Sequence, residues 1–209
     1  GDTLGLQTIG LKALDPISGL NIKSLDTKFM YADKQMRFDQ LNLFFNDSQI
    51  KNQIVFDYTS TKDFKFWNKK VRMKAYFDNS QIRGEDLGRF VSDMYQYKGM
   101  YKLKGNLEGP VARLNLKNFE MAFGSKSVLR GDFSFKGLPE IDKTVMDFDM
   151  VNSLFHPQDL QVFLSKSAVE KMNILGPVSF GGKFSGTNKD FSTSGKLNTG
   201  LGYMEGDVM

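Results

Sequence analysis

The sequence predicts an all-β protein with two short helices. Three observations carry this prediction. Apolar and polar residues alternate with a period of two over most of the 209 residues, polar turn signals separate the alternating runs, and only two stretches have apolar residues at helical spacing. Sheets built from such strands are antiparallel, with one apolar face and one wet face.

The first third of the chain reads as a series of strands joined by tight turns. Alternation predicts strands at 4–14, 20–25, 36–45, 50–58, 64–66 and 71–77. Residues 16–19, 46–48 and 78–80 carry turn signals between them. Asp39-Gln40 breaks the alternation in the way that a β-bulge does.

Two helices interrupt the strands. In 84–95, Leu87, Phe90, Val91 and Met94 follow helical spacing after an acidic start, and 157–172 has a similar apolar spacing. Strands are predicted at 100–107, 111–123, 128–135 and 145–151, and short glycine-rich strands follow from residue 178.

Short motifs recur at nearly constant offsets. Residues 85–90 resemble 158–163, residues 105–109 resemble 182–186, and residues 131–133 resemble 206–208, at offsets of 73, 77 and 75. Repeats of this kind stack into elongated objects. We therefore expect residues 1–209 to be a single elongated segment excised from a larger repeat protein, with approximate units at 84–137 and 157–209.

Composition disfavours most kinds of active site. The chain has no cysteine and one histidine, His156, which excludes disulfides, thiolate sites and multi-histidine metal centres. Asp147 and Asp149 alternate with apolar neighbours, which places them on the wet face of a strand rather than in a catalytic pair. We expect no enzyme activity, no cofactor and no metal. The net charge of +4 is spread along the chain, so nucleic acid is not an expected partner.

The apolar face is the remaining candidate site. Phe and Met supply 30 residues, 19 and 11 respectively, and such wide, adaptable side chains suit acyl chains. The pattern leaves two alternatives open, a core closed by a second sheet or an open apolar groove. The predicted lining residues are Leu41, Leu43, Phe45, Phe56, Met73, Phe77, Leu103, Leu107, Leu114, Leu116, Phe133, Phe135 and Phe148.

Several soft motifs resemble a known family. They are Ser80-x-Ile82, Asp86-Leu87 within Gly-Glu-Asp-Leu-Gly-Arg-Phe, Gly105 and Gly109 within Leu-Lys-Gly-Asn-Leu-Glu-Gly-Pro-Val, and Gly131. Over roughly 15–209 the chain resembles the AsmA/TamB family, in particular the internal part of TamB-type translocation and assembly module proteins of the Bacteroidota.

The resemblance implies elongated, curved antiparallel sheets that form a groove, a β-taco-like repeat. It implies a periplasmic location in a Gram-negative bacterium, with the parent protein anchored in the inner membrane. It also implies a bridge-like lipid-transfer role, with phospholipid or another acyl-chain ligand as the cargo and an Omp85-type outer-membrane protein as a partner of regions outside this chain. The alternative function is a module that assembles outer-membrane β-barrel proteins by binding their strands at an open sheet edge.

Overall fold

Twelve strands form one antiparallel sheet in the computed structural model, which describes residues 3–88 and 95–208. Every strand pairs with its neighbours in sequence, so the order in the sheet is β1 to β12 without a crossover. The strands are β1 (Leu4–Asp15), β2 (Leu20–Ala32), β3 (Gln35–Phe45), β4 (Ser48–Asp57), β5 (Arg72–Arg83), β6 (Met100–Gly109), β7 (Arg113–Phe123), β8 (Ser127–Lys136), β9 (Val145–Phe155), β10 (Val178–Gly186), β11 (Phe191–Thr199) and β12 (Gly202–Val208).

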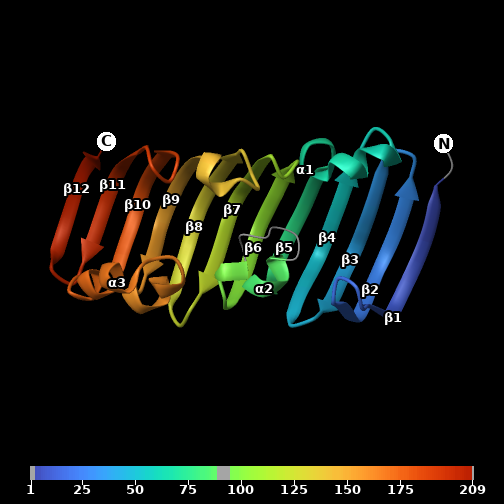
Figure 1. Cartoon of the computed structure of the whole chain (residues 1–209), viewed down its shortest axis with the longest axis horizontal. Helices are drawn as coiled ribbons and strands as arrows, with labels where there is room; N and C mark the ends of the chain where they lie inside the picture. The colour runs from blue at the N-terminus through green and yellow to red at the C-terminus, as the bar shows by residue number, and fades with distance from the viewer. Residues whose placement is uncertain (1–2, 89–94, 209) are drawn as a thin grey trace.

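The strands lie side by side along the long axis of the molecule, with the two ends of the chain at opposite ends of the sheet (Figure 1). The predicted all-β antiparallel fold is therefore confirmed. A second sheet does not occur among the described residues, because all twelve strands belong to the same one.

Short helical segments connect several strands. They are η1 (Thr61–Phe66), α1 (Trp67–Lys70), α2 (Gly84–Leu87), η3 (Ile141–Lys143), η4 (Pro157–Val162) and α3 (Lys166–Asn173). The predicted helical region at 157–172 is confirmed as η4 and α3. Of the helix predicted at 84–95, the structure has α2 and then a short 3-10 turn from residue 95, and Phe90, Val91 and Met94 lie outside the described residues.

The strand predicted at 64–66 is wrong, because these residues lie in η1. Ser60 caps this segment by accepting a hydrogen bond from the Lys62 amide, and Asp63 accepts one from the Ser60 amide. This reciprocal capping box starts a helical turn. The local cap therefore outweighs the alternation of Phe64 and Phe66 with Lys65.

The turn predicted at 78–80 is also wrong, since β5 runs through it to Arg83. Asn79 has φ 56° and adds one residue at a bulge, where the register shifts between Phe77 and Ser80. Asparagine tolerates left-handed backbone both in turns and in bulges, so its presence alone does not distinguish them.

Similar bulges recur across the sheet. Gln40, Asn118 and Asn152 have φ values of 50°, 48° and 46°, and each lies at a register shift in β3, β7 or β9. The bulge predicted at Asp39-Gln40 is confirmed. A bulged strand bends and twists more strongly, and a line of bulges through alternate strands therefore curves the sheet.

Glycines face this line of bulges on the intervening strands. A Cβ atom on Gly131 in β8 would lie 2.0 Å from the Asp149 carbonyl oxygen, and one on Gly105 in β6 would lie 2.6 Å from that of Asn118. Both glycines have positive φ, 147° and 124°. The sheet is closely packed at the bend because these positions have no side chain.

Two aspartates link helical segments by hydrogen bonds to turns at one edge of the sheet, the lower edge in Figure 1. Asp159 of η4 accepts hydrogen bonds from the amides of Ser125, Lys126 and Ser127 at 2.8 to 3.0 Å, and from the hydroxyls of Ser125 and Ser127. Partial burial raises the pKa of Asp159, but these hydrogen bonds outweigh burial and lower the pKa to about 2.

Asp86 of α2 occupies the corresponding place beside the β3–β4 turn. It accepts hydrogen bonds from the Ser48 hydroxyl, the Asn46 side-chain amide and the Asp47 backbone amide. Asp86 and Asp159 are separated by the offset of 73 found in the sequence. The division into units at 84–137 and 157–209 stays a prediction.

Candidate functional site: the apolar face of the sheet

All thirteen predicted lining residues lie on one face of the sheet. The pairing register joins them across strands, for example Phe56 to Met73, Leu107 to Leu116, and Phe133 to Phe148. On each bulged strand the alternation inverts at the extra residue. The apolar side chains before and after the bulge therefore point to the same face of the sheet. Leu41, Phe45, Phe77 and Phe133 are buried, and the other nine are half-buried.

The centre of this face is the hydrophobic core. Ala75, Phe77, Phe119 and Phe133 are buried together, with partly buried apolar residues around them. Since residues on both sides of the bulge line belong to this cluster, the bend brings the two halves of the face together. The middle of the face is therefore packed by the protein's own side chains.

Several residues of this face were not predicted. Phe119 and Met121 follow the bulge at Asn118, where the direction of alternation inverts, and both pack in the core cluster. Phe38 and Ile54 are paired on β3 and β4 on the same face. An asparagine inside an apolar alternation was the signal that could have located the inversion in β7.

Aromatic rings line the face in two rows. At the β10–β11 end, Phe133, Phe148, Phe184 and Phe191 follow one another with ring centres 5.2, 5.4 and 5.0 Å apart. Phe191 at the end of this row is 42% exposed. The row thus passes from the buried core to a solvent-accessible end.

The second row lies near the β2 end of the sheet. Phe29, Phe38 and Phe56 have successive ring centres 4.8 and 6.2 Å apart, and Trp67 of α1 packs 5.0 Å from Phe56. Such rings offer dispersion contacts and no directional hydrogen bond, so this surface suits apolar ligands.

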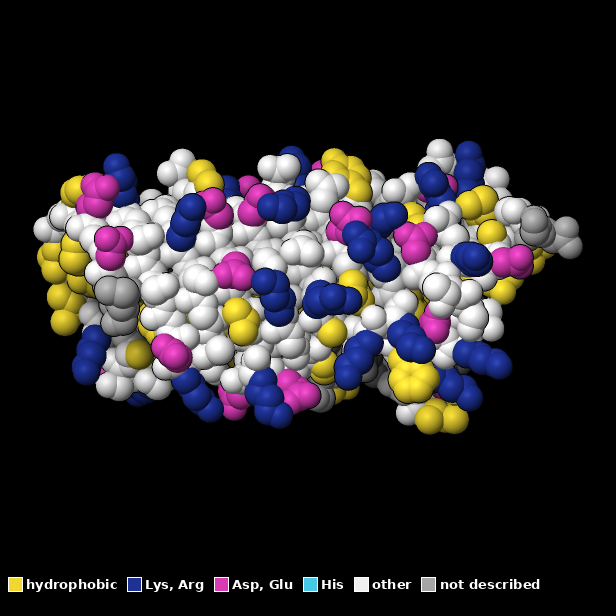
Figure 2. Space-filling view, turned by 90° about the horizontal axis from the view of Figure 1, so that it is seen from above, with side chains coloured by type: hydrophobic (Ala, Val, Ile, Leu, Met, Phe, Trp, Pro, Cys, Tyr) yellow, Lys and Arg dark blue, Asp and Glu magenta, His cyan; other side chains and the backbone are white. Residues whose placement is uncertain are grey.

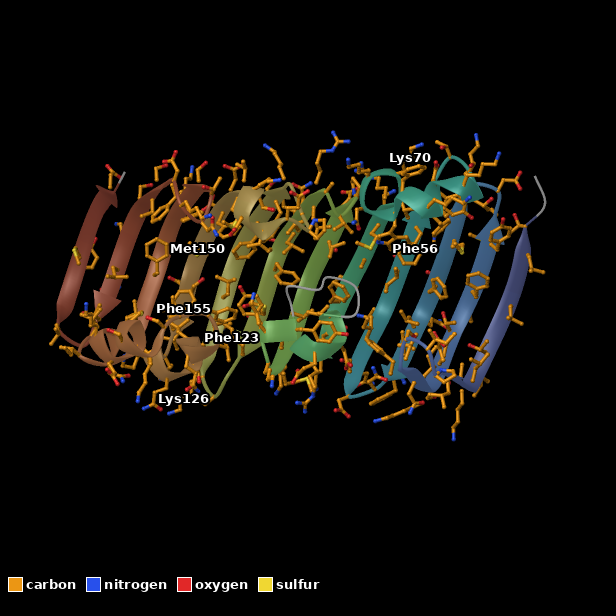
Figure 3. All side chains as sticks on the ribbon, in the orientation of Figure 1. Phe56, Lys70, Phe123, Lys126, Met150 and Phe155 are labelled. Atoms are coloured by element: carbon orange, nitrogen blue, oxygen red, sulfur yellow. The ribbon has the colours of Figure 1, made fainter. Side chains whose placement is uncertain are left out.

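Helical segments and lysines border the face at both strand ends. Figure 3 shows Lys70 beyond Phe56 at the upper edge, and Lys126 below Phe123 at the lower edge. Phe163 packs against Phe123 with ring centres 5.4 Å apart, as Trp67 does against Phe56. The segments η1–α1 and η4–α3 therefore each cover one border of the face.

Charged residues occupy the opposite face in pairs. Arg72 donates to Glu108 at 2.8 Å, and Lys117 donates to Asp132 at 2.7 Å. The hydrogen bond from Lys117, with a second from the Asn118 amide, lowers the pKa of Asp132. These carboxylates are engaged in cross-strand pairs of the kind that stabilise a solvated sheet face.

The other polar residues considered as a possible active site do not come together in one place. Asp147 accepts a hydrogen bond from the Ser185 hydroxyl at 2.6 Å, while Asp149 is exposed further along β9. His156 precedes η4 in extended backbone, and its amide donates to the Ser127 hydroxyl. In the described ranges, no group of three or more acidic or histidine side chains is arranged to hold a metal ion. No helix in these ranges is both long and apolar enough to cross a membrane.

Comparison with known proteins adds no identification: no family model, curated protein or solved structure matches the chain. The resemblance to the AsmA/TamB family therefore stays a prediction.

Proposed function

We propose that this chain binds the acyl chains of phospholipids along the apolar face of its curved sheet. In this proposal the chain is a non-enzymatic, periplasmic segment of a bridge-like lipid-transfer protein of the TamB type. Acyl chains lie along the groove while the head groups remain in water at its border.

One observation carries the proposal. A single sheet presents a continuous aromatic and aliphatic face, and among the described residues only short helical segments and the sheet's own curvature cover it. In a sandwich, a second sheet would bury such a face completely. Here Leu103, Leu107, Leu114 and Leu116 stay half-buried in the central strands.

The energetics favour a chain-like apolar ligand. Burying one methylene group contributes about 0.8 kcal/mol. A few methylene groups against the Phe148, Phe184 and Phe191 row therefore outweigh the entropy cost of ordering one side chain. Because the row consists of phenylalanine rings, which carry no hydrogen-bonding group, it favours length of apolar chain over any particular head group.

The alternative function is a module that binds strands of outer-membrane β-barrel proteins, adding an extended peptide to an open sheet edge by backbone hydrogen bonds.

Lipid analysis of the purified protein tests the proposal. The protein is isolated from bacterial cells without detergent, extracted with organic solvent, and analysed by mass spectrometry. A photo-crosslinking residue is placed at Phe191, on the apolar face, or at Tyr76, which is equally exposed on the opposite face of β5.

We expect co-purified phospholipid, and crosslinks to it from position 191 but not from position 76. Protein free of lipid, or equal crosslinking at both positions, would contradict the proposal. Capture of barrel-protein peptides by lipid-free protein would instead favour the edge-binding alternative.

A further inference from the structure

The segment between β4 and β5 combines a high density of lysine with exposed aromatic surface. Residues 61–70 include Lys62, Lys65, Lys69 and Lys70 against a single acidic residue, Asp63. Lys70 Nζ lies 3.7 Å from Asp63 Oδ1. Within the described residues, the other three lysines have no carboxylate within salt-bridge distance, and all are exposed.

Asp63 is committed to holding the segment together. It accepts hydrogen bonds from the Thr59 hydroxyl at 2.5 Å, from the Thr59 amide at 2.9 Å and from the Ser60 amide at 3.1 Å. These bonds, first of all the one from the Thr59 hydroxyl, lower the pKa of Asp63. The one acidic group thus faces inward, and the outer surface of the segment is cationic.

Two aromatic side chains in this segment serve different purposes. Trp67 packs against Phe56 and Phe64, with ring centres 5.0 and 5.6 Å away, and thereby fixes the segment on the sheet. Phe66 is 58% exposed, and Lys70 Nζ lies 5.0 Å from the centre of its ring. In Figure 2, hydrophobic side chains with basic side chains beside them protrude at the place of η1 and α1.

An exposed ring with a lysine beside it, in a segment that carries four lysines, suits the interface of an anionic bilayer. The ring enters the boundary between head groups and acyl chains, while the ammonium groups remain at the level of the phosphates. A cluster of four or more basic residues is attracted by the surface potential of anionic lipids. An acidic protein would match the charge equally but would leave the exposed ring without its apolar environment.

We propose that the η1–α1 segment is a membrane-docking site that places this end of the strands on the surface of an anionic phospholipid bilayer. The inference does not depend on lipid being held in the groove. It assigns a role to one border of the sheet, and Trp67 connects that border to the apolar face at Phe56.

Flotation with vesicles tests the inference, using the whole chain. Wild-type protein is mixed with vesicles of phosphatidylcholine alone, or of phosphatidylcholine with phosphatidylglycerol, at low and at high salt. The test variant is K65Q/K69Q, and the matched control is K102Q/K104Q, which removes the same charge from exposed positions of β6. A third variant, F66S, removes the exposed ring, and circular dichroism checks that each variant is folded.

Each lysine at an anionic surface contributes about fivefold to partitioning, so K65Q/K69Q is expected to weaken binding about 25-fold. The control is expected to change it by less than about fivefold, and F66S to weaken binding at both salt concentrations. Equal losses in the two double variants, equal binding to neutral vesicles, or no binding by the wild type would each overturn the inference. Because these measurements do not involve lipid in the groove, their failure leaves the proposed function untouched, and the reverse also holds.

Discussion

The substitution Asp159→Asn is expected to destabilise the fold through the loss of one charge. The side chain keeps its size, but the amide accepts fewer of the five hydrogen bonds and no longer attracts the donors as an anion. The pKa falls from 3.8 to about 2 in the folded state, a shift worth about 2.4 kcal/mol at about 1.36 kcal/mol per unit. Because the carboxylate is only partly buried, solvent screening reduces the expected loss to about 1–2 kcal/mol.

Urea unfolding followed by circular dichroism measures this loss as a function of pH. A lowered folded-state pKa contributes stability that is complete above the unfolded value near 3.8 and is lost as the pH falls toward 2. The difference between wild type and variant should therefore be constant near neutral pH and shrink as the pH falls from about 4 through 2. The matched control is Asp149→Asn, at an exposed position of β9, which should cost less than about 0.5 kcal/mol. Equal stability of Asp159→Asn and wild type at neutral pH, or a difference that does not shrink between pH 4 and pH 2, would refute the reasoning.

Three further substitutions probe the bend and the core. Gly131→Ala should cost about 2–3 kcal/mol in thermal or urea unfolding, because its Cβ would meet a backbone oxygen at 2.0 Å, whereas Gly206→Ala, with open space around its Cβ, should cost less than about 1 kcal/mol. Ser153→Ala should cost about 1–3 kcal/mol because its buried hydroxyl accepts from the Arg130 amide at 2.9 Å, while Ser134→Ala on the wet face should be nearly neutral; equal effects would contradict this assignment. Tyr101→Phe should remove one phenol from the alkaline ultraviolet titration of the folded protein, since burial raises the pKa of Tyr101 to about 12, and an unchanged titration curve above pH 11 would count against it.

Local patterns account for most of the secondary structure. Alternation located most of the strands because they have one apolar and one wet face, and Asp39-Gln40 revealed its bulge because the alternation inverts there. The same reasoning selected apolar residues that share one face, including Leu116 and Phe133, which are paired across β7 and β8; their role in lining a lipid groove stays a prediction. Alternation predicted the wrong structure at 64–66 and 78–80, because it does not detect capping by Ser60 or the left-handed backbone of Asn79.

The sequence by itself therefore determined the strands, their two faces and the apolar character of the candidate site. Only the tertiary structure decided between a sandwich and a single curved sheet, since that choice depends on which strands pair. Residues as distant as Phe77 and Phe133 meet in the core because the bulges of β5, β7 and β9 lie at one level, and one strand's pattern does not reveal its neighbour's register. The wide Phe and Met side chains thus line one continuous face of a single sheet instead of the interior of a sandwich.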